Sequence, residues 1–124
     1  MTTYTDLGIT YTIDPTAELT AFVSSALTDI TGARTILSSV DISDLTYFVT
    51  SIGPDAFKDC ATMTSITIPD SITSIEAGAF AECSTLDEII FENAELSILG
   101  DGIFVGATAI TSVLLTIKIG RAHV

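Results

Sequence analysis

Side chains that could perform catalysis are few in this sequence of 124 residues. The single histidine, His123, lies near the C-terminus, so neither a Ser-His or Cys-His dyad nor a zinc-ligand pattern is recognisable. Two carboxylates can hydrolyse a glycosidic bond, but only at a defined separation across a cleft, and no spacing here specifies one. The segment Gly100-Asp101-Gly102 lacks the Gly-Lys-Ser/Thr that completes a phosphate-binding loop. We therefore expect a protein that is not an enzyme and that uses no cofactor.

The two cysteines, Cys60 and Cys83, are far apart in the sequence, and Ala107 follows Cys83 at nearly the same interval. The cysteines could form a disulfide, they could belong to a metal site, or they could be small buried side chains, as unpaired cysteines often are. Alanine packs in a core but neither bridges nor ligates, so Ala107 favours buried, unpaired cysteines and no metal. Two cysteines alone do not identify the redox compartment.

Acidic residues dominate the charge, with 16 Asp and Glu against 4 Lys and Arg and a net charge of −12. Nucleic acid and anionic membrane surfaces repel such a chain, so we expect neither as a partner. The uncharged stretch Gly102–Ile117 is shorter than the ~20 residues of a membrane span, so we expect no membrane insertion. The acids are scattered and match no EF-hand loop, which favours a solubilising surface. The alternative is a calcium-tuned acidic edge around four of them: Asp87, Glu88, Glu92 and Glu95.

One pattern of apolar residues occurs three times along the chain. It is marked by Phe57, Phe80 and Phe104, which recur with a period of about 23–24 residues, and a period of this length predicts a solenoid whose units bury their apolar faces against their neighbours. With 48% apolar residues, one position would be apolar in all three copies by chance about once in nine, yet eight positions are. The eight sets are Val49/Ile72/Leu96, Ile52/Ile75/Leu99, Ala56/Ala79/Ile103, Phe57/Phe80/Phe104, Cys60/Cys83/Ala107, Met63/Leu86/Ile110, Ile66/Ile89/Val113 and Ile68/Phe91/Leu115.

Each copy contains a strand and a turn. In Met63–Ile68 the apolar Ile66 and Ile68 alternate with polar residues, which is the pattern of a half-buried strand. Pro69 cannot donate to a strand ladder and ends it. Gly53-Pro54-Asp55 predicts a short helical or 3₁₀ turn with proline at its first position.

Stacking of the copies places two kinds of residue. Parallel strands lie ~4.7–4.9 Å apart, so the three phenylalanines should form one continuous internal column. Strand residues that alternate with the core positions should face outward and form a candidate binding surface, in which two aliphatic residues stand out because exposed apolar patches often mark interaction sites. These outward residues are Ser65, Glu88 and Ser112 in one row and Thr67, Ile90 and Leu114 in the next.

The segment SITIPDSITSIEAGAFAEC, Ser65–Cys83, resembles the BspA-like class of leucine-rich repeats of bacterial, some protist and phage-associated proteins. Its matching pattern is I-x-I-P-x-S-[VI]-T-S-I-x-x-x-A-F-x-x-C. The third copy departs from the pattern at Phe91-Glu92-Asn93, Ile103 and Ala107. The resemblance covers roughly Phe48–Thr116. It implies a curved, mostly β, leucine-rich-repeat-like solenoid of parallel strands with a binding or adhesive role, located at a cell surface or on a virion.

Three regions are predicted. Residues 1–47 should form a β-rich N-terminal cap, because strand patterns occur there and terminal units of solenoids are atypical. For Ala17–Asp29 a short amphipathic helix is the alternative to a strand. Residues 48–117 should hold the three repeats. Residues 118–124 are predicted to be a non-native tail, because a sequencing adapter read in frame encodes them. The strand patterns of the cap region are Gly8–Asp14, Glu18–Ser24, Arg34–Leu37 and Thr46–Ile52.

The ends of the chain lead to two further expectations. Further repeats of the full-length protein should follow the third copy, whose last apolar residues lack a polar cap. The N-terminal Met1–Asp6 is polar, and no signal peptide is visible. This suggests a phage or virion component, or a start that is not the beginning of the gene.

Two functions fit these observations. The first is a non-catalytic binding or adhesion module that recognises a protein or a surface glycan through its solenoid surface. The second is a structural spacer or fibre segment of a larger surface or virion protein, with recognition elsewhere.

Overall fold

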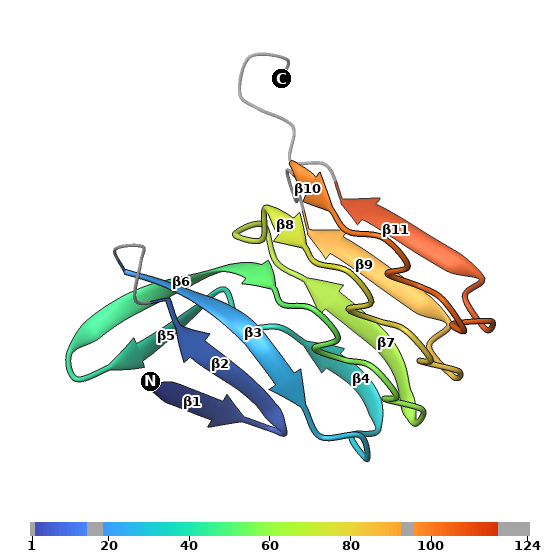
Figure 1. The fold of residues 1–124 in the computed structure, drawn as a ribbon, viewed down its shortest axis with the longest axis horizontal. Helices are drawn as coiled ribbons and strands as arrows, with labels where there is room; N and C mark the ends of the chain where they lie inside the picture. Colours follow the sequence, from blue (N-terminus) through green and yellow to red (C-terminus); the bar gives the residue numbers. More distant parts are fainter. Residues whose placement is uncertain (1, 15–18, 93–95, 117–124) are drawn as a thin grey trace.

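The computed structural model describes residues 2–14, 19–92 and 96–116, with side chains as far as Val113. Within these residues the chain forms strands and turns but no helix (Figure 1). The described residues therefore contain no helix that could cross a membrane. The strands are β1 (Thr3–Asp6), β2 (Ile9–Ile13), β3 (Thr20–Ala26), β4 (Gly32–Thr35), β5 (Ser39–Ile42), β6 (Leu45–Ile52), β7 (Met63–Ile68), β8 (Ser74–Ile75), β9 (Glu88–Glu92), β10 (Ile98–Leu99) and β11 (Ser112–Thr116). The predicted tail, 118–124, lies outside the described residues.

The strands form two sheets that face each other across the core. One has the order β1-β2-β3-β6-β8-β10 with β5 paired to β6, and the other has the order β11-β9-β7-β4. Each repeat contributes one strand to each sheet, first β6, β8 or β10 and then β7, β9 or β11, and repeats pair in parallel. The molecule is thus a mostly β solenoid of parallel strands, as the repeat pattern predicted.

Strands on the N-terminal side follow the same path one coil earlier. Strand β3 pairs in parallel with β6, and β4 pairs in parallel with β7. Strand β2 adds to β3 antiparallel, and the β1–β2 hairpin covers the end of that sheet. The segment Thr20–Ala26 is a strand, so the strand interpretation of that region is confirmed and the helical alternative is wrong. The boundary at residue 48 stays a prediction.

The core contains the predicted column of phenylalanines. The rings of Phe57 and Phe80 stack with centroids 5.2 Å apart and planes 8° apart, and those of Phe80 and Phe104 with centroids 5.7 Å and planes 12° apart. Phe57 and Phe80 are fully buried, whereas Phe104 is 38% exposed. The third copy is more exposed throughout, because no described coil stacks on it: Leu99 is 62% and Val113 54% exposed.

Backbone hydrogen bonds in the turns alternate between two directions. The N–H groups of Ala56, Lys58 and Cys60 donate within the coil to the carbonyl three residues earlier. The N–H groups between them donate to the next coil, as Phe57 does to Ala79 at 2.7 Å. The segment therefore shares i→i+3 bonds with the expected 3₁₀ turn but is a series of β-turns, with positive φ at Asp55 (56°). Each successive N–H has a partner, which stabilises the stack without a helix.

Candidate functional site

The six residues predicted to face outward lie in two straight rows across the second sheet. In one row Ser65 pairs in register with Glu88, and Glu88 with Ser112. The other row has the same registration: Thr67 pairs with Ile90, and Ile90 with Leu114. Ser65, Thr67, Glu88, Ile90 and Ser112 are all partly exposed. The side chain of Leu114 lies outside the part of the chain whose side chains are described.

Strand β4 extends both rows by one residue, which sequence reasoning missed. Ala33 lies beside Ser65, and Thr35 beside Thr67. The sequence signal was available, because Arg34–Leu37 was predicted as a strand, but the coil that contains it does not follow the period of the three repeats. We call the outward surface of β4, β7, β9 and β11 the strand face.

The strand face offers hydroxyl groups, one carboxylate and an aliphatic side chain. Alternation places it outward, since the residues between its members, Ile66 and Ile89, are fully buried. Such a surface can form hydrogen bonds and apolar contacts with a partner. No three His, Cys, Asp or Glu residues come together as a metal site in the described ranges. Of the proposed calcium edge, Asp87, Glu88 and Glu92 are described, and Glu95 lies outside the described residues.

A second set of hydroxyls joins one coil to the previous one. The hydroxyl of Thr85 donates to the carbonyl of Ala61 at 2.7 Å, and that of Thr62, at the equivalent position one repeat earlier, donates to Ile30 at 2.7 Å. These threonines serve the fold, because their hydroxyls satisfy backbone carbonyls. Sequence reasoning did not single them out, although their equivalent places in two successive repeats were visible.

The cysteines are buried and unpaired, as Ala107 suggested. The thiol of Cys83 donates to the carbonyl oxygen of Phe57 at 3.0 Å. The thiol of Cys60 donates to the carbonyl oxygen of Leu27 at 3.7 Å. Burial raises the pKa of Cys60 to about 11 and that of Cys83 to about 12. Both therefore stay protonated at neutral pH, which makes them poor nucleophiles.

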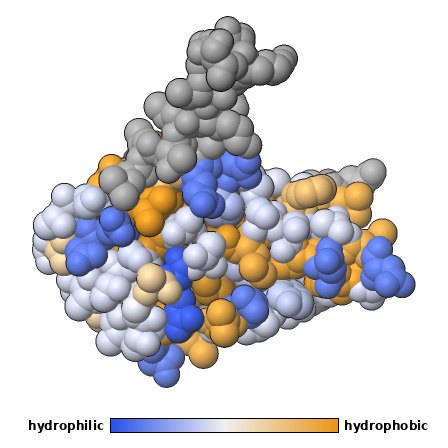
Figure 2. Space-filling model, turned by 180° about the vertical axis from the view of Figure 1, so that it is seen from behind, coloured by the Kyte–Doolittle hydropathy of each residue, from blue (hydrophilic) through white to orange (hydrophobic). Residues whose placement is uncertain are grey.

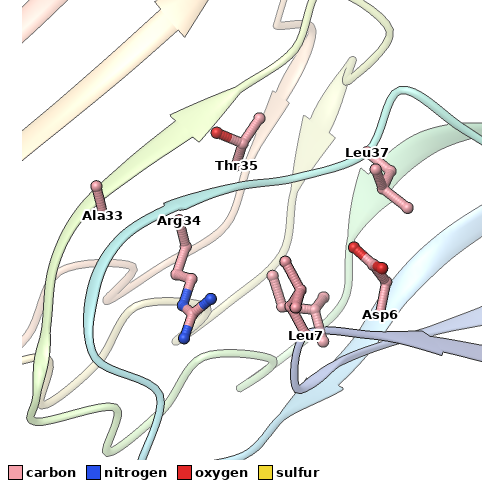
Figure 3. A pocket seen from close by; sticks show the side chains of 7 residues that line it. Asp6, Leu7, Ala33, Arg34, Thr35 and Leu37 are labelled. Carbon is pink, nitrogen blue, oxygen red and sulfur yellow. The ribbon is translucent and has the colours of Figure 1, made fainter.

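A cavity of about 250 Å³ opens at the N-terminal end, between β4 and the turn that joins β1 to β2 (Figure 3). Arg34 extends into it from β4, opposite Asp6 and Leu7. Sequence reasoning did not propose Arg34 or Asp6 as site residues, because neither belongs to a recognised motif. The cavity is lined by Asp6, Leu7, Ile9, Ala33, Arg34, Thr35 and Leu37.

Stacked parallel strands with a recurring core phenylalanine define this protein as a leucine-rich-repeat-like solenoid. The family model described as "BspA type Leucine rich repeat region (6 copies)" matches residues 33–122. The chain belongs to this BspA-type leucine-rich repeat family. The match begins before residue 48, where the repeats were predicted to start, and it includes β4.

Solved structures with this fold come from several bacteria. A leucine-rich cell surface protein of Faecalibacterium prausnitzii is 24% identical with a TM-score of 0.78, over 90% of this chain and 30% of that one. A leucine-rich repeat protein of Bacteroides capillosus is 24% identical with a TM-score of 0.68, over 91% of this chain and 97% of that one. The pneumococcal vaccine antigen PcpA is 19% identical with a TM-score of 0.57, over 93% of this chain and 38% of that one.

At these identities the likeness shows the fold alone. The chain spans about 30% of the length of the Faecalibacterium surface protein. No curated protein matches this sequence.

Proposed function

We propose that the protein is a non-catalytic binding module that recognises a protein or a surface glycan through the strand face. The observation that carries the proposal is the registered pair of rows, in which Ser65, Glu88 and Ser112 lie beside Thr67 and Ile90. A module of a bacterial surface or virion protein would present this face to an extracellular partner. The similarity to a Faecalibacterium cell surface protein supports that location.

The chemistry of the strand face suits a neutral or weakly polar partner. Its hydroxyls at Ser65, Thr67 and Ser112 donate and accept hydrogen bonds, and Ile90 offers a half-buried aliphatic contact at the centre of the face. Central apolar residues surrounded by polar ones are typical of interfaces. Glu88 beside these hydroxyls adds to the repulsion of polyanions.

The test replaces the apolar residues of the strand face. We expect the double variant Ile90→Asp, Leu114→Asp to lose capture by an array of immobilised extracellular-matrix proteins and glycans, while its circular dichroism spectrum stays that of the unsubstituted chain. Removal of a central apolar contact typically weakens an interface by ~2 kcal/mol or more, which is roughly 30-fold in Kd.

The matched control is Ala77→Asp. Ala77 is exposed in the turn after β8, away from β7, β9 and β11, and the variant adds the same kind of charge. We expect it to bind as the unsubstituted chain does. Unchanged capture by the double variant, or equal loss by the control, would remove the strand face from consideration.

A structural spacer is the second candidate function, and the exposure of the third copy favours it. Ile98, Leu99 and Val105 are 54%, 62% and 61% exposed, and β10 and β11 lie at the ends of their sheets. Figure 2 shows one broad side of the molecule, where hydrophobic areas alternate with hydrophilic ones. A further coil would cover the apolar residues of the third copy. This function predicts that the isolated segment captures nothing on the array.

A further inference from the structure

The cavity at the N-terminal end contains a charged residue in a position that the repeats reserve for hydrophobic side chains. Arg34 pairs in register with Ile66, which itself pairs with Ile89. Ile66 and Ile89 are fully buried in the core. Arg34 therefore enters the core side of the same sheet, at the coil where the apolar column ends. A partly buried charge in such a column requires an explanation.

The guanidinium of Arg34 has unused hydrogen-bonding capacity. Its Nε is buried and has no hydrogen-bond partner. Leaving a buried donor unsatisfied is costly, and an arginine presents its donors in a planar fork that matches a carboxylate. Figure 3 shows the guanidinium extending from β4 toward the turn between β1 and β2. The group is placed to receive an anion that enters the cavity.

The opposite wall of the cavity carries a negative charge. Asp6 lies at the end of β1, and Leu7 lies between its carboxylate and the guanidinium of Arg34 in the view of Figure 3. A simple anion would meet the charge of Asp6 and the net charge of −12, and a simple cation would meet Arg34. A small molecule with one charge of each sign satisfies both walls.

The remaining lining fits an aliphatic group. Leu7, Ile9 and Leu37 supply apolar surface, and the rim residue Leu7 is 71% exposed in a turn with positive φ. The cavity volume of about 250 Å³ is below the ~300–1,000 Å³ typical of sites for drug-sized ligands. The ligand must therefore be small.

We propose that this cavity binds a free aliphatic α-amino acid, with Arg34 holding its carboxylate, Asp6 its ammonium group and Leu7, Ile9 and Leu37 its side chain. The site adjoins the edge of the strand face, and Ala33 and Thr35 belong to both. The competing explanation is that Arg34 only covers the end of the apolar column with its methylene stem.

The test is a titration of the ¹⁵N-labelled chain with L-leucine, followed by amide chemical shifts. We expect shifts within residues 6–9 and 33–37, which comprise the residues that line the cavity and their immediate neighbours in the chain, with a Kd on the order of 1 mM. N-acetyl-leucine, which lacks the ammonium group, and leucinamide, which lacks the carboxylate, should each bind at least about 10-fold more weakly. That loss corresponds to one charge-assisted hydrogen bond.

Matched variants connect the binding to the two charges. Arg34→Met keeps an apolar stem and Asp6→Asn keeps the shape, and each should weaken leucine binding about 10–100-fold. Lys58→Met removes the other basic side chain of the described residues, which is exposed in a turn, and should leave binding unchanged.

Three results would overturn the proposal. One is the absence of shifts at tens of millimolar leucine. Another is equal binding of leucine and its two analogues, a comparison that needs no variant and so does not depend on Arg34→Met folding. The third is equal weakening by Lys58→Met. The strand-face variants leave this cavity intact, so the two proposals can fail separately.

Discussion

Replacement of Phe80 by alanine tests the stacked core most directly. Phe80 is fully buried, and its ring lies between those of Phe57 and Phe104. A buried Phe→Ala substitution costs about 3–5 kcal/mol through lost burial and the cavity left behind. Each stacked ring pair contributes about 0.5–1.5 kcal/mol more. Because Phe80 belongs to two such pairs, we expect a loss of about 4–8 kcal/mol, a large part of the ~5–15 kcal/mol that stabilises a typical domain.

Phe104→Ala is the matched control, because Phe104 occupies the same repeat position but is 38% exposed and, among the described residues, stacks on the ring of Phe80 alone. Its loss should be about 1–3 kcal/mol. The assay is urea unfolding followed by far-UV circular dichroism, with the m-value compared among variants. If Phe80→Ala is unfolded without urea, Phe80→Leu, expected to cost about 1–2 kcal/mol, takes its place.

Equal losses at the two positions would refute the reasoning. They would mean that the ring of Phe80 gains nothing from its second neighbour, and that burial does not increase from the end of the solenoid inward. If the coils unfolded one by one, the m-value would instead differ among the variants, because the stability of each unit in a repeat protein depends on its neighbours.

The turns, the buried ionisable groups and the end of the solenoid each give one further prediction. Gly100→Ala should cost about 1–3 kcal/mol in urea unfolding, because the added Cβ would collide with the backbone of Ala77; an unchanged stability would contradict the close contact between coils. The pKa values of Cys60, Cys83 and Tyr11 are raised to about 11, 12 and 12 by burial, so their stabilisation is complete below about pH 9 and is lost as the pH rises from there toward 12; a stability that is constant over this range would contradict their burial. Leu99→Lys should reduce concentration-dependent self-association in analytical ultracentrifugation, because Leu99 is 62% exposed at the end of a sheet; unchanged association would exclude this end as the contact.

The periodic part of the fold was predictable from the sequence because stacking imposes the same burial on the same position of every coil. Phe57, Phe80 and Phe104 identify the core column, and Ala107 distinguishes buried thiols from a disulfide. The outward rows followed from alternation alone, since register in a parallel sheet with one buried face is fixed by the apolar side.

The coil formed by β3 and β4 was not predictable from the period. The β5–β6 hairpin lies between this coil and the next and lengthens the sequence interval between them. Thr20 therefore pairs with Phe48, which lies more than one repeat length farther along the chain. Arg34 was missed for the same reason, because its alignment with Ile66 depends on that coil. The binding role of Ser65 and its neighbours stays a proposal, because hydroxyl groups on a strand are common to many surfaces.

The alternating turn bonds give the stack a direction. Gly78, Phe80 and Glu82 all send their N–H groups forward, to Asp101, Ile103 and Val105 of the coil that follows. Gly102, Phe104 and Gly106 occupy the corresponding positions of the last described coil. Anything that continues the column there must offer three carbonyl oxygens at matching intervals, and an inverted copy would oppose donor to donor. A unit that extends the column at this end would therefore have to join head to tail, and a two-fold symmetric pairing through this end is disfavoured.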